Sequence, residues 1–204
     1  NDGVMRSVVT SAGVSTHSKT LRGPEGWNIT GAMEFTDKSL GGDFHFGQYV
    51  VDIRRYQPIS LYDNLNLRIR AGTSEGDVPL QKQFEIGGLS SLHALPFKSE
   101  AGNRMLLANA EYILNGDFLN EIEFWPSWLM RRINILFMAD AGLTRTAPAS
   151  DSWNEGFRGI TWGEFKTDLG VGVASRSGSF RLAVVWRTDV KEPARFIFRF
   201  NRPF

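Results

Sequence analysis

Cysteine is absent from the sequence, and histidine is scarce. None of the 204 residues is cysteine, and the three histidines, His17, His45 and His93, lie far apart. The lack of cysteine excludes a disulfide scaffold, a thiolate metal site and a cysteine nucleophile. Because the histidines are so widely spaced, we expect neither a histidine metal site nor a cofactor.

The sequence also lacks a charge excess and long apolar runs. It has 23 Lys and Arg against 22 Asp and Glu, without the basic excess that is typical of nucleic-acid-binding proteins. Its apolar runs are short, such as Ile133 to Ala139, and none approaches the roughly 18 residues of a membrane helix. Nucleophile elbows, phosphate loops, dinucleotide loops and paired-histidine motifs are missing too. We therefore expect neither an enzyme nor a nucleic-acid partner.

The sequence is rich in glycine and aromatic residues, and its apolar and polar residues alternate with a period of two. It has 21 Gly, 15 Phe, 6 Trp and 4 Tyr. Apolar and polar residues alternate, as in β-strands: between Ile133 and Gly142, Ile135 and Phe137 lie on one face and Asp140 on the other. Segments of about ten residues, the length of a tilted transmembrane strand, show this pattern at 28–35, 48–54, 64–71, 103–114, 133–142, 164–173, 180–187 and 195–201. Residues 4–13 are a weaker ninth candidate.

The connections between these segments favour a barrel. Alternation alone does not separate a soluble sandwich, with its apolar face inward, from a transmembrane barrel with its apolar face on lipid. Tight turns at 57–60 and 175–178 lie on one side, and long loops at 73–102 and 143–161 on the other, as in outer-membrane barrels. We predict an all-β, antiparallel transmembrane β-barrel with the lipid bilayer as its partner. A soluble lipocalin-like carrier is the alternative.

The predicted domain organisation has two parts. Residues 26–204 are expected to form an outer-membrane β-barrel domain, and residues 1–25 either a lead-in segment or an extra strand. Eight antiparallel strands can close a barrel because the first and last run in opposite directions, whereas nine cannot close in this way. The chain is therefore expected to be either a minimal barrel or part of a larger one.

The connection 115–132 is long although it lies on the side of the tight turns. Its aromatic residues and flanking arginines suit a membrane–water interface. We predict an interfacial segment with Trp125 and Trp128 at the depth of the lipid headgroups. The alternative is a hydrophobic loop that closes a soluble core.

A series of short motifs carries a family resemblance. In chain order the motifs are Phe84-Glu85-Ile86-Gly87-Gly88, Ser90-Ser91-Leu92, Gly102-Asn103-Arg104, Asn109-Ala110-Glu111-Tyr112, Asp140-Ala141-Gly142 and the Gly170–Gly172 pair. Their order and spacing over residues 61–204 resemble the C-terminal barrel half of the BamA/TamA superfamily, or bacterial surface antigen family. The resemblance implies a sixteen-stranded barrel in the bacterial outer membrane, of which about eight strands lie in this chain.

The resemblance also implies a function and partners. Members of this family insert or translocate outer-membrane proteins, so the expected partners are outer-membrane protein clients or other outer-membrane subunits. Some relatives anchor fused enzymes. A passive membrane anchor or scaffold for a partner or fused domain is therefore the alternative function.

One family feature whose positions can be located in this sequence is a loop that folds back into the lumen. In the family, the tip of this loop contacts an acidic motif on a later strand. The tip position reads His93-Ala94-Leu95 here, with His93 in place of the family's arginine, and Met138 replaces the aromatic residue that begins the acidic motif. The resemblance predicts a lumen loop lock formed by His93, Asp140, Gly142, Glu111, Gly87 and Gly88.

The residues of this loop lock also have a simpler interpretation. Asp140 and Glu111 could pair with luminal arginines such as Arg181 or Arg187, and Gly87 and Gly88 could serve only a turn with positive φ.

The last predicted strand ends in alternating phenylalanines. Phe198, Phe200 and the terminal Phe204 resemble the C-terminal signal strand of outer-membrane proteins, although Arg202 stands where that signal prefers an apolar residue. The alternative is that these side chains are ordinary lipid-facing aromatics.

Overall fold

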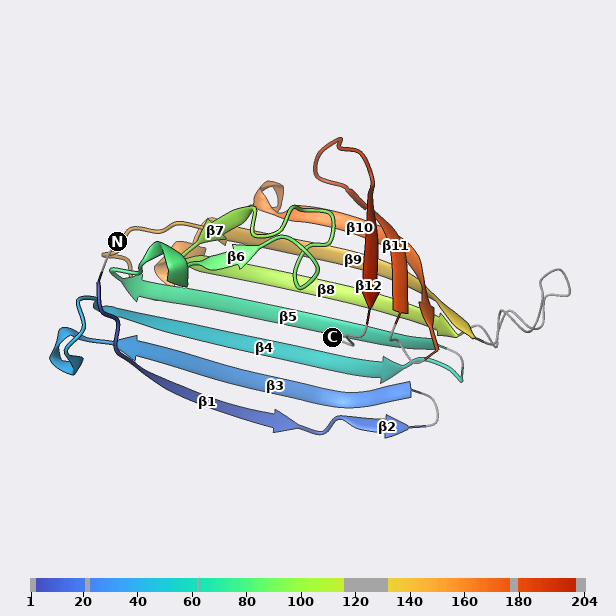
Figure 1. Cartoon of the computed structure of the whole chain (residues 1–204), viewed down its shortest axis with the longest axis horizontal. Coiled ribbons are helices and arrows are strands. Elements are labelled where there is room, and N and C mark those ends of the chain that lie inside the picture. The colour runs from blue at the N-terminus through green and yellow to red at the C-terminus, as the bar shows by residue number, and fades with distance from the viewer. Residues whose placement is uncertain (1–2, 21–22, 62, 116–131, 177–179, 201–204) are drawn as a thin grey trace, which may run out of the picture.

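One large antiparallel sheet forms most of the protein (Figure 1). The computed structural model describes residues 3–20, 23–61, 63–115, 132–176 and 180–200. In spatial order the sheet contains β1 (Ser7–Ser15), β3 (Gly23–Thr36), β4 (Phe46–Pro58), β5 (Asp63–Gly76), β8 (Arg104–Asn115), β9 (Ile133–Arg145), β10 (Lys166–Ser175), β11 (Phe180–Arg187) and β12 (Arg195–Phe200). The short β2 (Ser18–Thr20) also pairs with β3.

The remaining elements of the described chain are small and lie in the connections. β6 (Phe84–Ile86) and β7 (Glu100–Gly102) pair with each other inside the connection from β5 to β8. The 3-10 helices η1 (Lys38–Leu40), η2 (Leu80–Lys82), η4 (Glu155–Phe157) and η5 (Trp162–Glu164) each span three residues. No helix in the described ranges is both long and apolar enough to cross a membrane.

The all-β antiparallel fold and the eight predicted strands are confirmed. They correspond to β3, β4, β5 and β8 to β12, and the weaker candidate at 4–13 corresponds to β1. The predicted start of the first long loop, at Thr73, is too early, because Thr73 to Gly76 still pair with Phe46 to Tyr49. Trp125, Trp128 and Phe204 lie outside the described residues, as does most of the predicted interfacial segment.

The sheet is an open wall. In the part of the chain that the structure describes, its order ends at β1 and β12, which do not pair with each other. Figure 1 shows β11 and β12 running across the direction of β3 and β4, so that the wall curves. β1 adds a strand to the eight, and the minimal closed barrel that eight strands would allow is not formed.

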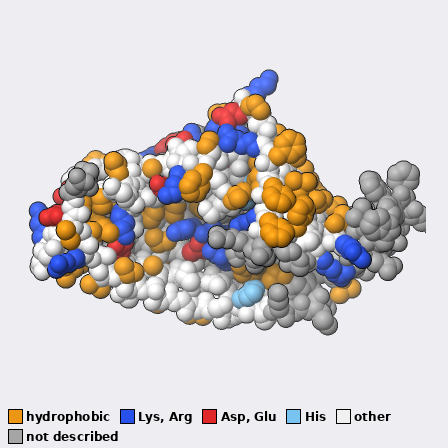
Figure 2. Space-filling view, viewed as in Figure 1, with side chains coloured by type: hydrophobic (Ala, Val, Ile, Leu, Met, Phe, Trp, Pro, Cys, Tyr) orange, Lys and Arg blue, Asp and Glu red, His pale blue; other side chains and the backbone are white. Residues whose placement is uncertain are grey.

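Antiparallel register gives this wall one apolar face. Directly paired residues point to the same side of a sheet, and pairing from β8 to β12 aligns Tyr112, Phe137, Val171, Val184 and Phe196 in one row. On the same face, Leu169 and Leu182 are exposed. Figure 2 shows hydrophobic side chains gathered over β11 and β12. This outward face is the one that the sequence predicts to lie on lipid.

The opposite, inner face is covered by the connection from β5 to β8. Phe84 and Ile86 of β6 pack with Leu92, Leu95 and two residues of β8, Met105 and Leu107, in a buried cluster. The alternation places polar residues on this inner face, yet apolar side chains of β8, β9, β11 and β12 also lie beneath the connection. The hydrophobic core therefore lies between the wall and its own loop.

Arginine on the outward face tests the expected contact with lipid. Val171→Arg and Leu182→Arg should each lower the free energy of unfolding in lipid vesicles by about 2–4 kcal/mol, the cost of a charge near the bilayer midplane. Urea titration measures the change. Thr30→Arg is the matched control, because Thr30 is exposed and pairs with the inward-facing Asp52. Equal losses in all three variants would contradict a lipid-facing row.

Candidate functional site

The site is built around the segment 87–99, called here the inner loop, which connects β6 to β7. Gly87 and Gly88 begin it with φ of 114° and 87°, in the left-handed region that favours glycine. A Cβ on Gly87 would clash with the carbonyl oxygen of Pro96, so the turn leaves no room for a side chain. The loop is closed by its own hydrogen bonds, from Gly87 N to Ser91 Oγ (2.8 Å) and from Gly88 N to Leu95 O (3.1 Å).

A polar row across the wall lies beneath this inner loop. Successive pairing aligns Arg54, Arg68, Asn109, Asp140, Asp168 and Arg187, which come from β4, β5, β8, β9, β10 and β11. The inner loop contacts four of these six residues, namely Arg68, Asn109, Asp140 and Asp168. Register therefore brings together side chains that are far apart in the sequence.

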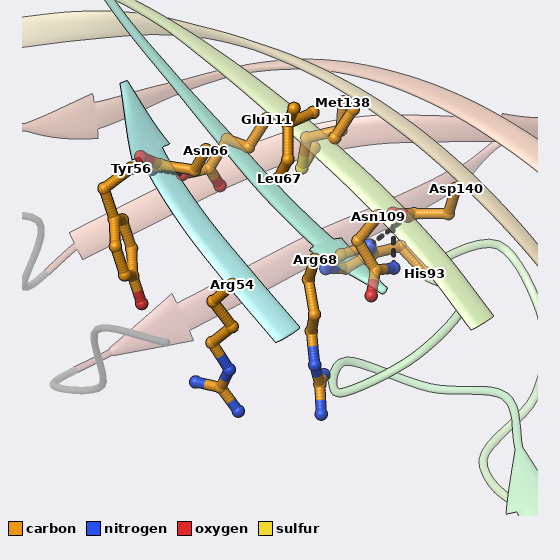
Figure 3. A pocket seen from close by; sticks show the side chains of 11 residues that line it. Arg54, Tyr56, Asn66, Leu67, Arg68, His93, Asn109, Glu111, Met138 and Asp140 are labelled. Carbon is orange, nitrogen blue, oxygen red and sulfur yellow. Dashed lines mark hydrogen bonds and ion pairs between the residues drawn. The ribbon is translucent and has the colours of Figure 1, made fainter. Parts of the chain in front are cut away.

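His93 at the tip of the inner loop contacts Asp140. Its Nδ1 lies 2.5 Å from Asp140 Oδ2, and both side chains are buried. Asn109 donates to the other oxygen, Asp140 Oδ1, at 2.7 Å and to the carbonyl of Ser91 at 2.7 Å. Figure 3 shows His93 and Asn109 converging on Asp140 at the side of a pocket. Asp140 is thus held from both the inner loop and β8.

The environment of His93 favours its charged form. Burial alone would lower the pKa of the imidazole, but the hydrogen bond and the negative charge of Asp140, with Asp168 nearby, raise its pKa above the usual value. The resemblance implies an arginine at this position in the family, and an arginine side chain is always charged. His93 can supply the same charge only while it holds a proton.

Asp168 is a contact residue that the sequence analysis does not single out. Its Oδ2 accepts a hydrogen bond from the backbone N–H of Ala94 at 2.8 Å, and its side chain is buried. Asp168 pairs directly with Asp140 across β9 and β10. Its position on the polar face of 164–173 is visible in the sequence, but the register that places it beside Asp140 is not.

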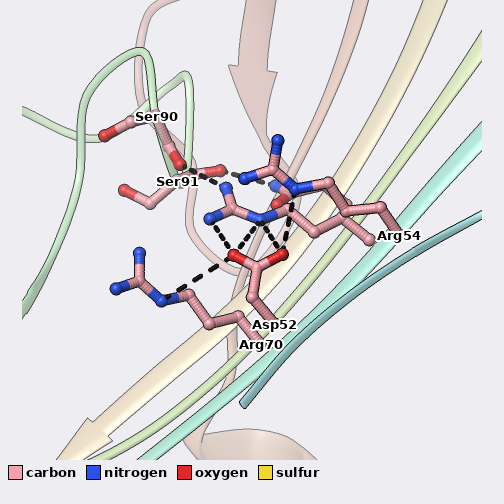
Figure 4. Close-up of polar contacts among 7 residues, drawn as sticks. Asp52, Arg54, Arg70, Ser90 and Ser91 are labelled. Carbon is pink, nitrogen blue, oxygen red and sulfur yellow. Dashed lines mark hydrogen bonds and ion pairs between the residues drawn. The ribbon is translucent and has the colours of Figure 1, made fainter. Parts of the chain in front are cut away.

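Arg68 fixes the start of the inner loop. Its Nη1 donates to the carbonyl of Ser90 at 3.0 Å, and its Nη2 lies 2.6 Å from Asp52 Oδ2. Arg54 Nε lies 2.9 Å from the other oxygen of Asp52, and Arg70 Nε lies 4.0 Å from Oδ2 (Figure 4). One carboxylate therefore has three guanidinium groups around it.

Apolar contacts hold the loop tip beside the polar ones. Ala94 packs on Met138, Ala183, Val185 and Ile197 of the wall, and Leu92 is fully buried in the cluster around β6. Gly142 lies under Leu92, and a Cβ there would clash with the Cδ1 of Leu92. The small residue at 142 makes room for the loop.

Glu111 contacts Arg181 rather than the loop tip. The Arg181 guanidinium pairs with the Glu111 carboxylate, and Arg187 pairs with Asp189 and Glu192. The simpler interpretation of Glu111 as the partner of a luminal arginine therefore has a matching contact. For Asp140, the ion pair in the described residues is with His93.

Phe198 and Phe200 lie on the outward face of β12 and are exposed. The ring of Phe198 meets that of Phe180 edge to face, with centroids 5.4 Å apart. Both side chains lie on the face of β12 opposite Ile197, which packs with Ala94 of the inner loop.

A larger residue at 142 tests the packing of the inner loop. Gly142→Val should lower the free energy of unfolding by about 1–3 kcal/mol through overpacking, and it should speed proteolytic cleavage within 87–99. Urea titration and limited proteolysis measure the two effects. Gly31→Val on β3 is the matched control, since no described atom lies within 4 Å of an added Cβ there. Unchanged cleavage of Gly142→Val would show that Leu92 does not depend on this space.

Comparison with known proteins identifies the family and the fold. No curated protein matches the chain. The crystal structure of BamA from Haemophilus ducreyi lacking POTRA domains 1–3 is similar, with a TM-score of 0.65 and 13% identity over 95% of this chain. The chain covers 40% of that protein chain, so it spans less than half of its length. The Omp85 superfamily domain matches residues 7–201. The chain therefore belongs to the Omp85 superfamily, and its wall of strands has the fold of a BamA-type barrel.

Proposed function

We propose that the protein assists the insertion or translocation of outer-membrane proteins in the bacterial outer membrane. Residues 26–204 would contribute strands to the barrel, with β1 from residues 1–25 as an additional strand. The proposed role is not enzymatic. Its partners would be the lipid bilayer and outer-membrane protein clients or other outer-membrane subunits.

The edge of β12 is the observation that supports this proposal most directly. Among the described strands, β12 pairs with β11 and ends the sheet order. An exposed strand edge can add an incoming strand through main-chain hydrogen bonds. Phe198 and Phe200 would act as a C-terminal signal strand on this edge.

The inner loop supports the same proposal from the inside of the wall. We infer that His93, Asp140 and Gly142 act as a loop lock, with Gly87 and Gly88 shaping the turn. A loop fixed at β8, β9 and β10 keeps the middle of the wall rigid while its last strand opens. Glu111 would contribute less directly, through its ion pair with Arg181.

Site-specific photocrosslinking tests whether β12 meets clients. A photocrosslinking residue at Phe198 should give adducts with newly made outer-membrane proteins in cells, because client strands would pair beside it. Ile69 in the middle of the wall is the matched control, since Ile69 and Phe198 are each 60% exposed on the outward face. We expect client adducts at position 198 and not at position 69.

The same experiment distinguishes the alternative function. A passive anchor or scaffold would give no client adducts at either position, although it would still be found in the outer membrane. Equal client adducts at both positions would show that clients touch the outward face without pairing at the edge of β12. Either result would contradict the proposed insertion role.

A further inference from the structure

Three buried side chains that could bind a metal converge at the tip of the inner loop. One ring nitrogen of His93 and one carboxylate oxygen each of Asp140 and Asp168 all lie within 4.8 Å of one another. His93 comes from the loop, Asp140 from β9 and Asp168 from β10. The wide spacing of the histidines disfavours a site built from several histidines, but this cluster needs only one histidine and two aspartates.

The two carboxylates repel each other when both are ionised, and His93 supplies one positive charge for the two. Asp140 and Asp168 are direct partners across antiparallel strands, and like charges in that position repel. Both side chains are buried, so water screens the repulsion little. In the described residues, Asp140 has an ion pair with His93, and Asp168 has none.

One oxygen of Asp168 points to a missing ligand. Asp168 is 1% exposed, and its Oδ1 has no hydrogen-bond partner among the described residues. Its other oxygen, Oδ2, is held by the N–H of Ala94 at 2.8 Å. A buried carboxylate oxygen without a donor is rare in folded proteins, and a bound cation is one way in which such an oxygen is satisfied.

We propose that His93, Asp140 and Asp168 bind one divalent transition-metal ion, with Zn²⁺ as the best fit. An imidazole nitrogen and two carboxylate oxygens are a donor set that suits Zn²⁺, with a water molecule as the fourth ligand. The metal takes the place of the proton between His93 and Asp140. Mg²⁺ and Ca²⁺ fit less well, because they need more oxygen ligands than two carboxylates supply.

The neighbouring contacts orient the proposed ligands. Asn109 donates to Asp140 Oδ1 and Ala94 N donates to Asp168 Oδ2, which leaves Asp140 Oδ2 and Asp168 Oδ1 for the metal. Such outer contacts set the orientation of metal ligands. His93 Nδ1 and Asp140 Oδ2, now 2.5 Å apart, have to separate to admit the ion. The position of His93 on a loop allows this shift.

A bound ion would join the inner loop to β9 and β10 at a single point. The inference goes beyond the proposed function, because metal binding by the purified protein does not depend on any client. The photocrosslinking result at Phe198 and the metal titration can therefore fail independently.

Metal titration of the full-length protein in detergent tests the proposal. After removal of metals with a chelator, Co²⁺ should give visible absorption typical of four- or five-coordinate Co²⁺, and one equivalent of Zn²⁺ should abolish it. Isothermal titration calorimetry should show one Zn²⁺ per chain. His93→Ala and Asp168→Asn should each weaken Zn²⁺ binding at least tenfold, since the loss of outer contacts alone costs about 10–100-fold.

His45→Ala is the matched control. His45 also pairs with an aspartate, its Nδ1 lying 2.8 Å from Asp37 Oδ2, but that pair is more exposed and lies outside the proposed metal site. The variant should bind Zn²⁺ as the wild type does. Heat-modifiable gel migration reports folding of each variant, and His93→Gln replaces His93→Ala if the latter does not fold.

The outcomes that would overturn the proposal are specific. Absence of Co²⁺ absorption and of Zn²⁺ binding in the wild type would show that the three groups share only a proton. Equal Zn²⁺ binding by the wild type, His93→Ala and Asp168→Asn would place the ion elsewhere on the surface. Displacement of Co²⁺ by Mg²⁺ as readily as by Zn²⁺ would contradict the proposed donor chemistry.

Discussion

The antiparallel register of β8, β9 and β10 is the constraint on which the site depends. It places Asn109, Asp140 and Asp168 side by side on the inner face, and it does so through backbone hydrogen bonds alone. A shift of one residue in any of these pairs would turn its side chains to the outward face. The contacts of the inner loop therefore report the correct pairing of three strands, and the loop can settle only on a wall that is already in register.

A curved sheet with one face on lipid cannot form a core by packing against a second sheet. Here the core comes from the connection between β5 and β8, which places Phe84, Ile86, Leu92 and Leu95 against the inner face. Glycines under the connection make this close approach possible, as at Gly142, where a side chain would meet Leu92. The inner loop thus contributes both buried apolar contacts and residues of the candidate site.

The positions of the strands, and the face of the sheet on which each side chain lies, could be predicted from the sequence because both depend on local alternation. The eight segments correspond to strands, and Asp140 and Gly142 both lie on the inner face that was predicted for them. Asp168 could not be found in the same way, since its importance comes from its partner across the ladder and not from its neighbours in the chain. The buried inner face was also missed, because Leu136 and Met138 alternate with outward residues whatever covers them.

The three guanidinium groups around Asp52 have an electrostatic consequence for the interior of the wall. Arg54, Arg68 and Arg70 outnumber the single carboxylate between them, so β4 and β5 carry surplus positive charge on the inner face. On β9 and β10 the charges of Asp140 and Asp168 are offset by His93 and by Lys166 of the same face. Acidic groups that approach the inner face are therefore drawn toward β4 and β5.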